Sequence, residues 1–125
     1  MLEKLLGTMD ILLGDKGCPW DKEQTHESLC ENLKEECNEV IEAIFKKDFE
    51  NLKEELGDVL LQVVFHAKIA EKAGRFNMQD IILALDEKLI SRHSHIFGSD
   101  VATSAEEAMD FWNKNKKKER KTEQI

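Results

Sequence analysis

Two pairs of acidic side chains stand three residues apart along the chain, Glu36 with Glu39 and Glu55 with Asp58. Where such a stretch is helical, both members of a pair project from one side of the helix over about one turn. A sheltered carboxylate takes up a proton or acquires a cation, because burying its charge without compensation is costly. All-oxygen ligands suit a hard cation, and Mg²⁺ binds through a few carboxylates together with substrate phosphates. The spacing therefore predicts an Mg²⁺ site, in which Mn²⁺ can substitute.

The carboxylates must be positioned by two helices, which the sequence predicts over residues 25–47 and 48–73. On the first helix most acids lie opposite an apolar stripe, whereas Glu36 lies at the edge of that stripe. Apolar residues cover most of the circumference of the second helix, so it must be buried on more than one side. A polar strip with Glu55 and Asp58 then points into protein or a cleft. If the two helices pack antiparallel across their short connection, the four carboxylates converge.

Other interpretations of these polar residues remain open. An ordinary solvated face would account for the acids of the first helix. A di-iron centre is disfavoured, because it requires two Glu-x-x-His motifs and the chain has one, at residues 23–26, where a helix starts. His66 on the polar strip is more typical of a hydrogen-bonded histidine than of a metal ligand. His93 and His95 stand two apart, which on a helix points them in different directions. Lys68 belongs to a separate arc that can face water.

Basic and aromatic side chains could complete a polyphosphate site. A carboxylate-held cation offsets the acidic field that would otherwise exclude such a substrate. Lys88 and Arg92 are four residues apart on a predicted third helix and share a face, although an exposed basic pair is the alternative. Lys53 is a looser phosphate candidate. Trp20 and Trp112 could each stack on a base, while tryptophan in a small helical protein more often serves packing.

Sparse turn residues predict an all-α fold, since the chain has one proline and six glycines. The predicted helices cover residues 2–13, 25–47, 48–73, 78–92 and 105–112, and residues 14–21 form a loop. Asp48 and Ser104 are predicted N-caps, and Gly74 is a typical residue to end a helix. The predicted architecture is a bundle of four main helices plus a short N-terminal helix. We expect oligomerisation to complete it, because a second subunit would cover one apolar side of the second helix.

The end of the chain differs from the rest in charge. Residues 114–125 hold six of the 18 basic residues and only two of the 26 acidic ones. The sequence is therefore divided into one helical domain over residues 1–113 and a basic C-terminal tail over residues 114–125. A basic run of this kind is typical of a solvated, fraying helix end, and a phosphate-binding role is the alternative.

Composition excludes several classes of function. A net charge of −8 repels phosphate backbones, so nucleic acid is a poor partner. No apolar stretch reaches the length of a membrane span, and the first residues lack the features of a signal peptide. The three cysteines have no CxxC spacing, so free thiols are expected. These features predict a cytoplasmic protein with no membrane partner.

Four motifs in order give the chain a resemblance to a known family. They are Gly17-Cys18-Pro19-Trp20-Asp21, Glu35-Glu36-Cys37-Asn38-Glu39, Glu55-Leu56-Gly57-Asp58 and Arg92-His93-Ser94-His95-Ile96-Phe97. With these motifs the chain resembles the MazG-type nucleoside triphosphate pyrophosphohydrolases, which belong to the all-α NTP pyrophosphatase superfamily. The resemblance covers about residues 8 to 120.

The resemblance implies an Mg²⁺-dependent hydrolase that converts an NTP or dNTP to the monophosphate and pyrophosphate and works as a homodimer or higher oligomer. It implies Glu36, Glu39, Glu55 and Asp58 as metal ligands, with Glu35 near the metals to orient or deprotonate water. It also implies phosphate and base contacts at Lys88, Arg92 and Trp112, and weaker ones at Lys53 and Trp20. Ser94, Cys37-Asn38 and Lys53 depart from the usual residues of the family.

The leading hypothesis is therefore nucleoside triphosphate pyrophosphohydrolysis, with nucleotide-pool cleansing as a possible purpose. One alternative is a non-catalytic helical oligomerisation module, in which the carboxylates form a solvated surface. Another is a nucleotide-binding regulator that keeps the site but turns over slowly.

Overall fold

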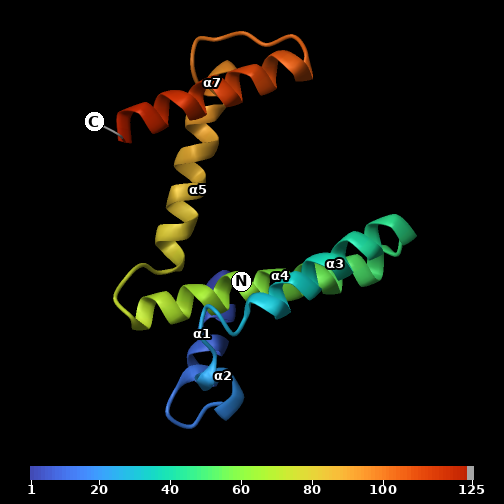
Figure 1. Ribbon diagram of the computed structural model, residues 1–125, viewed down its shortest axis with the longest axis vertical. Coiled ribbons are helices and arrows are strands. Elements are labelled where there is room, and N and C mark those ends of the chain that lie inside the picture. Colours follow the sequence, from blue (N-terminus) through green and yellow to red (C-terminus); the bar gives the residue numbers. More distant parts are fainter. Residues whose placement is uncertain (124–125) are drawn as a thin grey trace. The chain divides into compact units, whose positions relative to one another are not determined.

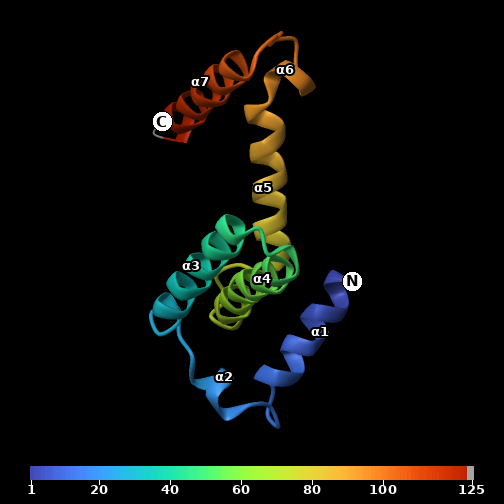
Figure 2. The same ribbon diagram turned by 90° about the vertical axis from the view of Figure 1, so that its right-hand side faces the viewer.

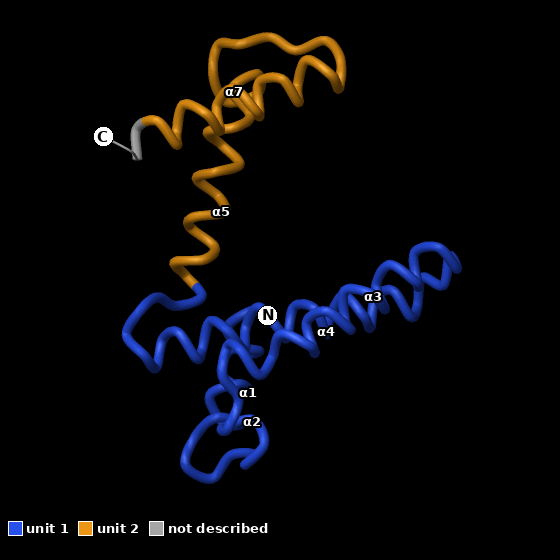
Figure 3. Tube along the Cα trace, in the orientation of Figure 1, with its two compact units in different colours: residues 1–78 blue, residues 79–125 orange. Residues whose placement is uncertain are grey.

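A computed structural model of the chain describes residues 1–123, which contain helices and no strand (Figure 1). The helices are α1 (Leu2–Leu13), α2 (Pro19–Glu23), α3 (Cys30–Lys46), α4 (Phe49–Lys72), α5 (Met78–Arg92), α6 (Ser94–Phe97) and α7 (Ala105–Glu123). The predicted all-α class is confirmed. Among the described residues, no helix combines the length and the apolar character that a membrane span requires. The chain divides into two compact units, of which the first covers residues 1–78 and the second begins at Gln79 (Figure 3).

The hairpin of α3 and α4 forms the centre of the first unit, where the two helices lie side by side (Figure 2). Lys47 adopts a left-handed conformation with φ 55° and ends α3. Asp48 then caps α4 as predicted, because its Oδ1 accepts a hydrogen bond of 3.2 Å from the Asn51 N–H. The far end of α4 is followed by Gly74, whose φ of 73° suits a residue without a Cβ.

The start of α3 differs from the prediction, which placed it at residue 25. Residues 25–29 form turns instead, because short side chains there bond locally. The Thr25 N–H donates to Ser28 Oγ over 2.8 Å, and the Ser28 N–H donates to Thr25 Oγ1 over 3.0 Å. Serine and threonine bonds of this kind compete with the helical backbone pattern.

The predicted loop over residues 14–21 is also partly wrong, because Pro19 starts the short helix α2. Proline is well suited to a first helical position, since its missing N–H is not needed there. The turn before it is held by a hydrogen bond of 2.8 Å from the Cys18 N–H to the Leu12 carbonyl. This turn passes so close to α1 that a Cβ on Gly17 would collide with the backbone oxygen of Leu12.

Apolar side chains from α1, from α3 and the residue before it, and from α4 build the core of the first unit. Its most deeply buried members are Met9, Leu29, Ala43, Val64, Phe65, Ala67 and Ala70. The prediction that Lys68 faces water is wrong. Its side chain is 13% exposed, and its Nζ binds Asp10 Oδ1 on α1 at 2.7 Å and Glu71 Oε2 at 3.3 Å.

The second unit contains α6, α7 and all of α5 after Met78. Ser104 caps α7 as predicted, with its Oγ accepting from the Glu107 N–H over 3.1 Å. Glu107 in return accepts from the Thr103 N–H over 2.9 Å. Helix α7 is longer than predicted and continues past Trp112 to Glu123, while residues 124–125 of the predicted tail lie outside the described residues. Asn115 Nδ2 donates to Ser94 Oγ over 2.8 Å and ties α6 to α7.

Candidate functional site

Three of the four predicted metal ligands come together where α3 and α4 pack. Glu36 and Glu39 project from α3, and Glu55 projects from α4. One carboxylate oxygen of each lies within 4.8 Å of the other two. Asp58 lies one turn beyond Glu55 and is half-buried, and its charge acts on Glu36. We call Glu36, Glu39 and Glu55, together with the neighbouring Asp58, the four-carboxylate cluster.

Mutual repulsion and burial change the acidity of this cluster. The hydrogen bond between Glu39 and Glu55 raises the pKa of Glu55 to about 7, with burial and the neighbouring charges acting in the same direction. Burial raises the pKa of Glu36 as well, and the charges of Glu39 and Asp58 add to that effect. Carboxyl groups with raised pKa values in one cluster are a feature of functional sites.

The cluster also contains oxygens that have no donor. Glu36 Oε2 and Glu55 Oε2 are buried and find no hydrogen-bond partner within the described part of the chain. Buried polar atoms are almost always satisfied, so each such atom calls for an explanation. A hard divalent cation fits this donor set, because it takes oxygen ligands and compensates negative charge.

Glu35, the predicted group for orienting water, stands beside the cluster on α3 but is exposed. Gln62 continues the polar strip of α4 beyond Asp58 and is 6% exposed, with its Oε1 unpaired among residues 1–123. His66 ends the strip. Its Nδ1 lies 2.7 Å from Nδ1 of His26, which confirms that His66 is a hydrogen-bonded histidine. The sequence predicted no partner for it.

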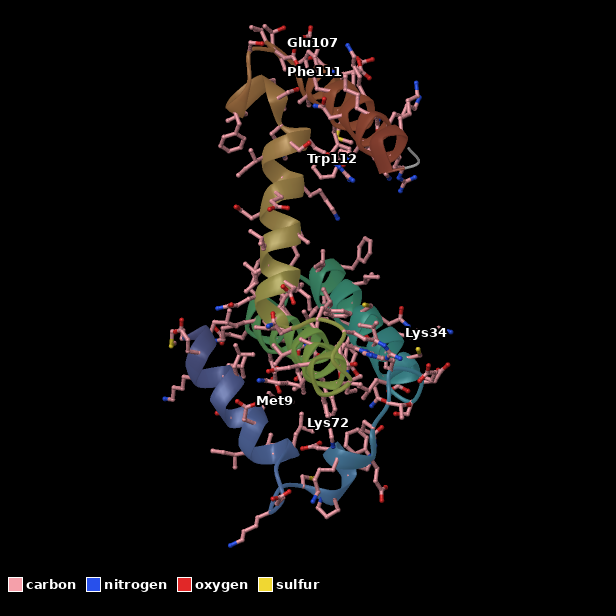
Figure 4. All side chains as sticks on the ribbon, turned by 90° about the vertical axis from the view of Figure 1, so that its left-hand side faces the viewer. Met9, Lys34, Lys72, Glu107, Phe111 and Trp112 are labelled. Carbon is pink, nitrogen blue, oxygen red and sulfur yellow. The ribbon has the colours of Figure 1, made fainter. Side chains whose placement is uncertain are left out.

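A second cluster of predicted residues lies in the second unit, on α5 and α7. The guanidinium of Arg92 lies over the ring of Trp112, 4.9 Å from its centroid, and Figure 4 shows Trp112 projecting from α7. The ring of His93 meets Trp112 edge-on at a centroid distance of 5.5 Å. Lys88 is exposed one turn before Arg92. Arg92 and Trp112 are therefore in contact, as a joint phosphate and base site would require.

Glu119 is part of this second cluster and was not predicted. Its Oε2 accepts hydrogen bonds from Arg92 Nε at 3.2 Å and from Nη2 at 3.1 Å. Its Oε1 accepts from Ser91 Oγ at 2.6 Å. The hydrogen bond from Ser91 lowers the pKa of Glu119, and the bond and charge of Arg92 lower it further. No local spacing in the sequence indicates this contact, because 27 residues separate the two partners.

The two weaker candidates lie elsewhere. Trp20 is on α2, and its side chain is 52% exposed. Lys53 is on the exposed side of α4, where its Nζ binds Glu50 Oε2 at 3.0 Å.

A cavity of about 480 Å³ lies among α1, α2 and the end of α4. Its charged lining is Asp10, Asp21, Lys22, Lys68, Glu71 and Lys72. Acidic and basic side chains are balanced there, and Lys68 is already bound by Asp10 and Glu71. The lining therefore favours neither an anionic nor a cationic ligand.

Comparisons with known proteins find a matching family model and several relatives. The family model for the MazG nucleotide pyrophosphohydrolase domain matches residues 24–97. The nucleoside triphosphate pyrophosphohydrolase/pyrophosphatase MazG of Thermotoga maritima is 49% identical over 120 residues, which are 96% of this chain and 47% of that protein. The nucleoside triphosphate pyrophosphohydrolase of Escherichia coli is 42% identical over 120 residues, which are 95% of this chain and 46% of that protein.

A solved structure extends the likeness to the fold. The crystal structure of a mazG-related protein from Thermotoga maritima superposes with a TM-score of 0.75 at 34% identity, over 92% of this chain and 98% of that one. The chain spans about half the length of the curated relatives that it matches.

Proposed function

The chain belongs to the MazG nucleotide pyrophosphohydrolase family, and from this premise we propose that it hydrolyses an NTP or dNTP to the nucleoside monophosphate and pyrophosphate with the help of Mg²⁺. The observation that carries the proposal is the convergence of Glu36, Glu39 and Glu55, whose oxygens lie within 4.8 Å of one another. Two buried oxygens of this cluster lack a donor among the described residues. A divalent cation held by these carboxylates would allow an acidic chain to bind a polyanion.

The four-carboxylate cluster would hold the metal, with Mn²⁺ as a possible substitute. A bound divalent cation would neutralise charge on the triphosphate and lower the pKa of a water molecule. Glu36, Glu39 and Glu55 would supply the nearest oxygens, and Asp58 would complete the set. Glu35, exposed beside them, would orient the attacking water or accept its proton.

Three further residues are proposed as nucleotide contacts. Arg92 and Lys88 are proposed to contact the phosphates, because a guanidinium binds phosphate oxygens through paired N–H groups. Trp112 would stack on the base, since its ring is large and already fixed against Arg92 and His93. Lys53 and Trp20 are weaker candidates for the same two tasks.

We also propose that the working form is a homodimer or a higher oligomer. Many large apolar side chains are exposed on the two long helices of the first unit, among them Ile41, Phe45, Phe49, Leu56, Leu60 and Leu61. Single exposed apolar residues are ordinary, but gatherings of them mark interaction surfaces. Light scattering at several protein concentrations would measure the subunit number, and a strictly monomeric chain would contradict this proposal.

The decisive experiment is a panel of NTPs and dNTPs, normal and damaged, incubated with the protein with and without Mg²⁺. We expect pyrophosphate only in the presence of the metal. The same panel would reveal the base and sugar preference and whether nucleotide-pool cleansing is the purpose.

The two alternatives predict other outcomes of this panel. A slow nucleotide-binding regulator would be stabilised by nucleotide and Mg²⁺ without forming product. An oligomerisation module would respond to neither, and that result would reject the proposed activity.

A further inference from the structure

Arg92 is held on one edge by Glu119. An arginine side chain has five N–H groups in a rigid fork. Glu119 Oε2 accepts from the Nε–H and from one N–H of Nη2. The two N–H groups of Nη1 and the second one of Nη2 therefore remain without an acceptor among the described residues. These donors lie at the end of the fork, where a phosphate can bind through two parallel hydrogen bonds.

We propose that Glu119 is a positioning residue that fixes the Arg92 guanidinium over Trp112 and leaves the end of the fork available to the phosphates of the nucleotide. This inference rests on the proposed function, because it assumes that Arg92 binds phosphate. Glu119 itself touches no substrate in this arrangement and acts through Arg92.

Three contacts make this arrangement rigid. Ser91 Oγ donates to Glu119 Oε1 over 2.6 Å and holds the carboxylate from its other side. The Arg92 side chain is 12% exposed, so its pair with Glu119 is screened by water less than a surface pair would be. The ring of Trp112 covers one face of the guanidinium at 4.9 Å. Arg92 is therefore fixed at one edge and one face before a nucleotide arrives.

The packing around Trp112 extends this support. His93 Nδ1 lies 2.6 Å from the Leu89 carbonyl, so the ring donates from this nitrogen. The same imidazole meets Trp112 edge-on. Because His93, the residue after α5, thus supports the Trp112 ring that covers Arg92, the guanidinium has few alternative positions. Pre-formed geometry of this kind matters for affinity, since ordering a long side chain on binding is costly.

A competing role for Glu119 predicts the opposite result. If its carboxylate were an internal substitute for phosphate, the nucleotide would have to displace it, and its removal would strengthen binding. The positioning role predicts weaker binding after removal. A glutamine would preserve the positioning, because its amide oxygen can accept the same two N–H bonds.

The test uses the full chain and titrates magnesium tripolyphosphate, a probe that presents phosphates without a base, by calorimetry. We expect Glu119→Ala to raise the dissociation constant about tenfold, and Glu119→Gln to stay within about twofold of the unmodified protein. In an Arg92→Ala background, Glu119→Ala should have little further effect, because a positioning residue acts through its partner. Unchanged or tighter binding by Glu119→Ala would overturn the proposal. Full additivity of the two substitutions would do so as well, since it would indicate a general structural role.

A spectroscopic measurement tests the contact itself. The Arg92 Nε–H resonance in ¹⁵N NMR should exchange slowly with solvent in the unmodified protein and in Glu119→Gln, and rapidly in Glu119→Ala. Glu106→Ala, which removes an exposed acid from the first turn of the same helix, is the matched control and should change neither readout. Slow exchange that persists in Glu119→Ala would overturn the proposal.

The outcomes separate the two proposals. Normal pyrophosphate release together with an unaffected Glu119→Ala variant would reject the role of Glu119 alone. Tripolyphosphate binding that depends on Glu119, without pyrophosphate release from any nucleotide, would reject the proposed activity alone. No binding of tripolyphosphate by the unmodified protein would reject the role of Glu119 whatever the activity.

Discussion

His26 and His66 lie edge to edge in nearly one plane, with their ring centroids 5.0 Å apart and their planes 3° apart, and a 2.7 Å hydrogen bond joins their Nδ1 atoms. In such a bond one Nδ1 donates and the other accepts, so the accepting ring must be neutral. His26 lies in the turns before α3, and His66 lies on α4. The pair therefore ties the entry of one ligand-bearing helix to the other.

Acid should weaken this connection. Burial lowers the pKa of His66 from its usual value near 6.5, and the charge of His26 lowers it further. As the pH falls below about 6.5, the unfolded chain therefore binds more protons than the folded chain. The contribution of this pair to folding stability is lost as the pH falls from there through the pKa of His66 in the folded chain. We expect His66→Gln to cost about 1 kcal/mol at pH 8 and less at pH 5. Urea unfolding at both pH values measures this, and a cost that grows toward pH 5 would contradict the assignment.

Metal affinity should depend on pH through Glu55, whose pKa is raised to about 7. The proton on Glu55 must leave before a cation binds, so Mg²⁺ affinity should fall by about tenfold for each pH unit below 7. In the absence of metal, a low pH should instead favour the folded chain. The raised pKa of Glu55 favours the folded chain at low pH, and this contribution is lost as the pH rises through about 7. Thermal melting at pH 6 and pH 8 with and without Mg²⁺ checks both statements. Equal stabilisation by Mg²⁺ at the two pH values would reject the predicted pH dependence of Mg²⁺ affinity.

Replacement of Glu39 by glutamine should separate activity from stability. Glu39→Gln removes one proposed ligand and should lower pyrophosphate release by about 10³-fold at saturating Mg²⁺, since a bound metal contributes several kcal/mol. The same change removes the group that acts most on Glu55, so the metal-free protein should melt at a slightly higher temperature at pH 8. Glu42→Gln is the matched control, because Glu42 is an exposed acid on the same helix and pairs with Lys46 at 2.6 Å. Asp58→Asn should behave like Glu39→Gln. Full turnover in either variant would exclude the assigned roles.

Local signals explain which parts of the fold could be predicted. The cap at Asp48 and the positive φ of Gly74 depend on one or two neighbouring residues, so the ends of α4 were predicted well. The sequence does not predict the helix α2, because Pro19 beside Gly17 is typical of a loop, although proline also starts helices. The turns at residues 25–29 were missed because their side-chain bonds to the backbone outweigh the helical pattern.

In the candidate site, too, features within one helix could be predicted from the sequence, whereas contacts between helices could not. Helical periodicity alone predicts that Glu36 shares a helix face with Glu39. It likewise predicts that Glu55 shares one with Asp58. Arg92 and its partner Glu119 are 27 residues apart in the sequence, and His66 and its partner His26 are 40 residues apart. Only tertiary packing brings these partners together. Lys68 was predicted to face water for the same reason, since its partner Asp10 is on another helix. Periodicity describes one helix at a time and cannot identify a contact between helices.

The ion pair between Asp10 and Lys68 should anchor α1 on α4. Lys68 Nζ lies 2.7 Å from Asp10 Oδ1, and the lysine side chain is 13% exposed, so loss of the partner leaves a largely buried charge with Glu71 alone. We expect Asp10→Ala to lower the free energy of unfolding by about 2 kcal/mol at pH 7, the range for hydrogen bonds to charged groups. Asp15→Ala, an exposed acid in the following turn, is the control and should cost little.

A pH series adds a second test of this pair. The bond to Asp10 raises the pKa of Lys68 above its usual 10.5, with Glu71 adding to the effect. The stability that the pair contributes is therefore present below about pH 10.5 and is lost as the pH rises through the folded pKa. The difference between the unmodified protein and Asp10→Ala should accordingly shrink above pH 10.5. Chemical unfolding at pH 7 and pH 11 measures it, and a difference that stays constant would mean that Asp10 stabilises α1 by packing rather than by charge.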